Sequence, residues 1–116
     1  METFNIYINS ELPFDDCAYL VRSLINANSV NLSEYQKEQK RYGENYGGAY
    51  YLFECLGIEF YFVKNEGEMF ENEYDNFNYY LILNINEYSH QGSGLFIAEY
   101  INDFLASKKL LTKLEL

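Results

Sequence analysis

The chain has 116 residues, of which 18 are acidic and 8 basic, and its formal net charge is −10 at pH 7. This balance argues against nucleic acid and anionic membranes as partners, because proteins that bind phosphates gather Lys and Arg on one face. With 48% apolar residues, the chain can bury one sizeable core, and we expect a single domain over residues 1–116. No segment resembles a membrane span and the N-terminus lacks the pattern of a secretion signal, so the cytoplasm is the expected location.

The first half of the chain predicts one strand, one helix and a polar connection. Apolar and polar side chains alternate over residues 3–9, which is typical of a strand with one buried face. A helix is expected over about residues 13–27, with Pro13 in its first turn and an apolar stripe at helical spacing. Residues 28–48 are mostly polar and are expected to form a surface connection. The helical stripe consists of Phe14, Cys17, Leu20, Val21 and Leu24.

Residues 49–86 predict most of the sheet, and Gly57 interrupts the phase of its alternation. Either a tight turn or a bulge in one bent strand would explain the interruption. A turn would place Glu54 opposite Glu59, which is a like-charge pair that costs stability. The sequence leaves this choice open.

A second turn is expected at residues 65–67, where glycine fits the left-handed position of a three-residue hairpin. This hairpin would pair Lys64 with Glu68 and Phe62 with Phe70, and would open a strand over residues 68–74. The following strand, over residues 79–86, is apolar on both faces and is therefore expected in the middle of the sheet.

A second helix is expected over about residues 94–107, with Ser93 as its N-cap. Its apolar stripe consists of Ile97, Tyr100, Ile101, Phe104 and Leu105. The tail that follows suits either a short edge strand or a docked extension. The expected order is β-α-β-β-β-β-α, with or without a final strand. This is an α+β domain in which two helices pack on a mostly antiparallel sheet of four to six strands.

The sequence offers little support for catalysis. The two cysteines, Cys17 and Cys55, lie on apolar faces, where a thiol is usually a small buried hydrophobic group, and His90 lies in a polar loop. Cys and His are too few and too scattered for structural zinc. No calcium loop or phosphate loop is present. We therefore expect no cofactor, no metal and no enzyme activity, with a small enzyme as the least favoured alternative.

The most informative segment is Glu66–Asp75, which holds five carboxylates and no basic residue. An edge strand protected by charge against aggregation would explain part of this pattern. A surface that meets a positively charged protein would explain all of it, because tyrosines beside the carboxylates supply the contacts enriched at interfaces. The candidate partner-binding residues are Glu66, Glu68, Glu71, Glu73, Tyr74, Asp75 and Tyr79.

At this point the chain resembles, as a type, the immunity proteins of bacterial contact-dependent growth inhibition and related polymorphic toxin systems. The resemblance covers residues 42–68 and the order of helices and strands. It implies a one-to-one inhibitor that covers the active site of a cognate toxin domain, most often an RNase, tRNase or DNase. The alternative is a phage-encoded acidic inhibitor, such as an anti-CRISPR or a DNA mimic, and the neighbouring genes would distinguish the two.

Overall fold

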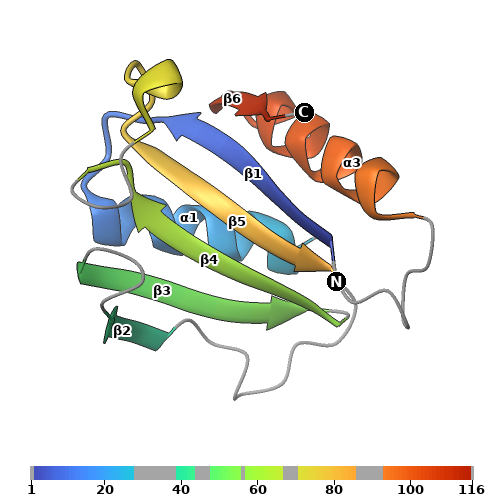
Figure 1. Ribbon diagram of the computed structural model, residues 1–116, viewed down its shortest axis with the longest axis horizontal. Coiled ribbons are helices and arrows are strands. Elements are labelled where there is room, and N and C mark those ends of the chain that lie inside the picture. The colour runs from blue at the N-terminus through green and yellow to red at the C-terminus, as the bar shows by residue number, and fades with distance from the viewer. Residues whose placement is uncertain are drawn as a thin grey trace.

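A computed structural model (Figure 1) describes residues 2–27, 39–43, 48–55, 57–66, 71–85 and 93–115. Within these ranges the chain forms six strands, two α-helices and one 3₁₀ turn. The elements in chain order are β1 (Glu2–Asn9), α1 (Phe14–Ala27), β2 (Gln39–Gly43), β3 (Gly48–Cys55), β4 (Ile58–Lys64), the 3₁₀ turn (Asn72–Tyr74), β5 (Tyr79–Ile85), α3 (Gly94–Ser107) and β6 (Leu111–Leu114).

The described strands form a single antiparallel sheet in the order β2-β3-β4-β5-β1-β6. The predicted α+β fold is therefore confirmed. β5 lies between β4 and β1, as the apolar residues on both of its faces predicted. The tail forms β6, which pairs with β1 at one edge of the sheet.

Both helices pack on the same face of the sheet. Their buried side chains share one core with alternate residues of the strands, such as Ile6, Phe60 and Leu83. Figure 1 looks onto the opposite face, with α1 behind the strands. The predicted stripe of α1 is confirmed, since Phe14, Cys17 and Val21 are buried and its remaining members lie half-buried beside them.

The stripe of α3 differs from the prediction at one position. Tyr100 is exposed, whereas Ala98 and Leu105 are fully buried. Ser93 occupies the N-cap, but its side chain makes no capping hydrogen bond. The carboxylate of Glu2 lies at this helix end instead, so close to Gly94 that a Cβ there would meet it. Negative charge is favourable at the positive end of a helix dipole.

The interruption at Gly57 is a turn. Gly57 has φ 79°, a conformation that favours glycine, and β3 pairs directly with β4 around it. Glu54 therefore lies opposite Glu59, the like-charge pair that a turn implied.

Two segments differ from the prediction, one expected connection and one expected strand. The connection predicted over residues 28–48 contains β2. Its polar sequence shows little alternation, and backbone pairing with its one neighbour, β3, holds it at the edge of the sheet. The strand predicted over residues 68–74 is absent from residues 71–74, where a 3₁₀ turn lies. β4 pairs with β5 instead, with Phe62 opposite Leu81 and Lys64 opposite Tyr79, so the predicted hairpin at 65–67 is wrong. Glu68 and Phe70, its expected pairing partners, lie outside the described residues.

Candidate functional site

The acidic segment belongs to the connection between β4 and β5, and Asn65 holds the described part of this connection in place. The Asn65 side chain donates hydrogen bonds to the backbone carbonyls of Tyr74 and Phe77, each at 2.9 Å. Its Oδ1 accepts the backbone N–H of Glu71 at 2.8 Å. Asn65 is only 7% exposed. Breaking the hydrogen bonds of a buried amide costs free energy, so these contacts fix residues 71–77 against the end of the sheet.

The carboxylates of this connection point into solvent. Glu66, Glu71, Glu73 and Asp75 are all exposed, and Glu68 lies outside the described residues. Glu66 approaches Lys64 at 3.9 Å, but both side chains are largely exposed, so this ion pair contributes little stability. Within the described part of the chain, the other three carboxylates form no ion pair. Since residues 71–75 are not part of an edge strand, protection of an edge does not account for their charges.

The two tyrosines predicted to contact a partner occupy different places. Tyr74 is half-buried, and its ring stacks on Tyr7 with 3.9 Å between centroids, while Lys113 lies over the Tyr74 ring at 5.6 Å. Tyr79 is 8% exposed and faces the helices, where its hydroxyl donates to the carbonyl of Leu12 at 2.7 Å. Tyr79 shares the parity of Leu81, which places it in the core, and this corrects the prediction for that residue.

The sequence pattern did not indicate a second surface, the sheet face opposite the helices, here called the open face. One end of it is covered by Tyr74 and Phe77, which pack on Tyr7, Val63 and Tyr80. The rest of it includes the half-buried Tyr50 and Tyr61, which pack on this cluster, and Leu52, which lies opposite Tyr61. The alternation along β4 could have indicated that Tyr61 and Val63 face away from the helices. Both faces of β4 are rich in apolar and aromatic residues, however, so the pattern does not show which face the helices cover.

Two carboxylates mark the end of the open face farthest from the acidic connection. Glu54 is exposed and Glu59 is half-buried, and they lie directly opposite each other on β3 and β4. Neither forms an ion pair with a described residue. Like charges in this arrangement are destabilising. The open face therefore has carboxylates at both ends and an aromatic and aliphatic centre.

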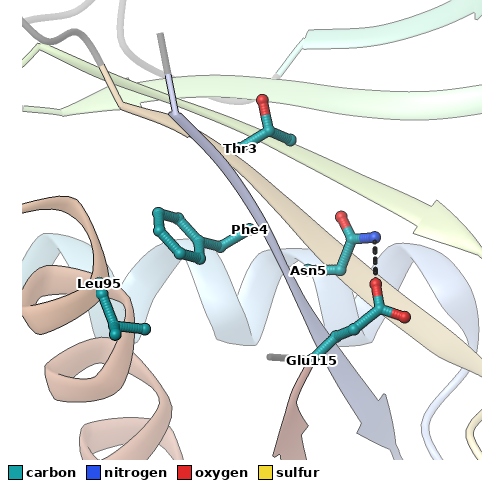
Figure 2. A pocket seen from close by; sticks show the side chains of 5 residues that line it. All are labelled: Thr3, Phe4, Asn5, Leu95 and Glu115. Carbon is teal, nitrogen blue, oxygen red and sulfur yellow. Dashed lines mark hydrogen bonds between the residues drawn. The ribbon is translucent and has the colours of Figure 1, made fainter.

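A shallow hollow of about 450 Å³ adjoins the open face at β1, a size within the range of small-ligand pockets. Figure 2 shows its lining side chains: Thr3, Phe4 and Asn5 of β1, Leu95 of α3, and Glu115. The Asn5 amide donates to the Glu115 carboxylate at 3.2 Å, and the Thr3 hydroxyl donates to Oδ1 of Asn84 at 2.9 Å. The carboxylate, the Asn5 carbonyl oxygen and the Thr3 oxygen are all hydrogen-bond acceptors.

Glu71 and Glu115 also affect the buried tyrosines between them. Burial, and then these two carboxylates, raise the pKa of Tyr80 to about 12. Burial, followed by Glu115 and Glu71, likewise raises the pKa of Tyr7. The negative potential thus extends from the connection to β6, because each anion disfavours a tyrosinate nearby.

The described residues contain no group of three or more His, Cys, Asp or Glu side chains placed to hold a metal ion. Both cysteines are buried, and burial raises the pKa of the Cys17 thiol, which favours the unreactive protonated form. His90 lies outside the described residues. No described helix has the length and apolar character needed to cross a membrane.

Comparisons with protein-family models, with curated proteins and with solved structures found no match to this chain.

Proposed function

We propose that this protein binds and neutralises a positively charged protein, as the immunity proteins of bacterial toxin systems do. The observation that supports this proposal is the set of exposed carboxylates on the β4–β5 connection. Glu71, Glu73 and Asp75 are held on a connection anchored by Asn65, and none of them is paired with a described cation. A preorganised anionic surface binds without first losing the conformational freedom of a flexible loop.

The expected partner is the nuclease domain of a toxin. The groove of a nuclease carries positive charge because it binds phosphates, and carboxylates that occupy the groove exclude the substrate without any chemical step. A chain with a net charge of −10 also attracts a basic partner over distance, which accelerates association at low salt.

The test is co-expression with the product of the adjacent gene and purification of the complex. Calorimetric titration of one separated partner into the other then measures the affinity. We expect a one-to-one complex with a basic nuclease-like domain. The combined variant Glu71→Lys, Glu73→Lys and Asp75→Lys should bind at least about 30-fold more weakly, since breaking charge pairs at an interface costs about 2 kcal/mol or more. The same variant should fail to protect cells from the toxin.

The matched control carries Asp16→Lys, Glu99→Lys and Asp103→Lys, three exposed positions on the helices. It changes the net charge by the same amount, so a loss confined to the first variant locates the contact on the connection. Equal binding by both variants and the wild type would contradict the role of these carboxylates.

A further inference from the structure

The edge of β1 is only partly paired. β6 pairs with Ile6–Asn9 of β1, and just beyond β6 the backbone N–H of Glu115 donates to the carbonyl of Asn5 at 2.9 Å. Backbone groups of alternate residues in a strand point to opposite neighbours, so the N–H and C=O of Thr3 point to the same side as the Asn5 carbonyl. No described residue bonds them there. The first half of β1 therefore presents a strand edge beyond the end of β6.

This edge borders the hollow between β1 and α3. Thr3 is exposed, and it lines the hollow together with Phe4, Asn5, Leu95 and Glu115. Figure 2 shows the Phe4 ring on the side of Leu95, whereas Asn5 points towards Glu115. A strand added to a sheet lies about 4.8 Å from its neighbour, which places it in this hollow.

The first half of β1 lacks features that keep natural edges from pairing. Natural sheets protect an edge with lysine, proline or a bulge, among other devices. Residues 2–5 contain neither lysine nor proline, and their continuous register with β5 leaves no room for a bulge. The one charged side chain of this stretch, Glu2, lies against Gly94 at the N-terminus of α3. The edge is therefore competent to pair with an added strand.

The side chains around the edge indicate the composition of such a strand. Successive side chains of a strand point to opposite faces of the sheet. One residue of an added strand would meet the apolar surface of Phe4 and Leu95, and the next would lie on the face of Glu115. Glu115 forms no ion pair with a described residue, and Lys113, two residues before it, lies over the ring of Tyr74. An apolar residue followed by lysine or arginine matches both faces.

We propose that the first half of β1 is a docking edge for an extended segment of the basic protein partner, which adds to the sheet beyond β6. This inference rests on the proposed function and adds a second contact to the acidic connection. The N–H and C=O of Thr3 bond the backbone of the segment. One apolar side chain of the segment packs on Phe4 and Leu95, and its basic neighbour reaches Glu115. A second copy of this chain suits the edge less well, because two molecules with a net charge of −10 repel each other.

The experiment is amide hydrogen exchange, measured by NMR on the ¹⁵N-labelled protein alone and in complex with the product of the adjacent gene. In the free protein the Thr3 amide should exchange rapidly, since no described residue accepts its hydrogen. In the complex its exchange should slow at least about tenfold, because the backbone of the partner accepts it.

The possible outcomes separate this inference from the proposed function. A complex in which the exchange of the Thr3 amide is unchanged would overturn the docking edge while the proposed function stands. A Thr3 amide that is already protected in the free protein would overturn it too, because another part of the chain would then occupy the edge. If the product of the adjacent gene forms no complex, both proposals fail.

The variant Thr3→Pro tests the backbone contact by affinity. Proline removes the N–H that faces the edge and spares the bonds between β1 and β5, and strands tolerate proline at such positions. This variant should bind the partner about tenfold more weakly. The control Thr3→Ala keeps the N–H and removes the side-chain bond to Asn84, so it should change the affinity less than about twofold. Equal affinities of the two variants would contradict the backbone contact.

The apolar contact is tested on α3. Leu95→Lys should weaken binding about fivefold, because it places a charge where the apolar side chain of the segment packs. Phe96→Lys is the matched control, since Phe96 is 73% exposed at the next position of the helix and does not line the hollow. It should change the affinity less than about twofold. Equal losses in these two variants would exclude the hollow as the place of contact.

Discussion

At the scale of single residues, Tyr7 has an environment that its place in the strand pattern did not indicate. It alternates with apolar residues and was expected on the polar face of β1, yet it is fully buried. Tyr74 stacks on it, and the Tyr7 hydroxyl has no well-formed hydrogen bond to a described residue, although the Asn5 side chain lies close enough to favour its ionised form. A buried hydroxyl without a partner lowers stability, because it has lost its bonds to water.

The substitution Tyr7→Phe should therefore stabilise the protein at pH 8 by about 1 kcal/mol. The raised pKa of Tyr7 also has a consequence at high pH. Above pH 10 the unfolded chain releases the Tyr7 proton while the folded chain retains it, so stability falls as the pH rises towards the folded-state pKa. Each such group contributes a loss of up to about 1.4 kcal/mol per pH unit.

Urea unfolding of the wild type and of Tyr7→Phe, at about pH 8 and about pH 11, measures both effects. The variant should lose less stability than the wild type between the two pH values. A destabilised variant at pH 8 would show that the hydroxyl has a partner in solution.

At the scale of elements, the β4–β5 connection depends on one side chain. Asn65 bonds the backbone at Glu71, Tyr74 and Phe77, and these bonds position both the carboxylates and the two aromatic rings that cover Tyr7. The local sequence suggested a hairpin and a strand here. Hydrogen bonds from a side chain to the backbone compete with strand pairing, and in this connection they replace it.

The substitution Asn65→Ala should destabilise the protein by about 2 to 3 kcal/mol, since it removes three hydrogen bonds of about 1 kcal/mol each. Hydrogen exchange should become faster at the amides of Glu71 and Phe77, which the connection now protects. Asn72→Ala is the matched control, because Asn72 is exposed on the same connection and should change stability by less than about 0.5 kcal/mol. Unchanged exchange in Asn65→Ala would mean that the packing of Tyr74 alone holds the connection.

At the scale of the whole molecule, the net charge of −10 opposes folding through self-repulsion. Negative charge is concentrated on the acidic connection and at the Glu54–Glu59 pair. Among the described residues, the only ion pair that offsets these carboxylates is Lys64–Glu66. The same distribution that suits a basic partner therefore lowers the stability of the unbound protein.

The midpoint of urea unfolding should rise between about 20 mM and about 300 mM NaCl, because the Debye length shortens and the repulsion is screened. The variant Glu54→Lys with Glu59→Lys has a net charge of −6, since each of two reversals adds two charges to −10, and its midpoint should rise less. A midpoint that falls with salt would indicate that attractive ion pairs dominate the folded state.

Periodicity alone determined the elements whose buried face is set by local spacing. α1, α3, β1 and the central position of β5 were predictable, because a stripe at helical spacing or apolar residues on both faces of a strand encodes burial directly. The acidity of residues 66–75 was likewise visible as composition.

Only the tertiary structure decided which side chains are exposed and which are buried. β2 is a polar strand that depends on pairing with β3, Asn65 turns the predicted strand after β4 into an anchored connection, and the parity of β5 buries Tyr79. The open face arises because both helices pack on the same side of the sheet. These features depend on contacts between residues that are distant in the chain, and local sequence patterns do not encode such contacts.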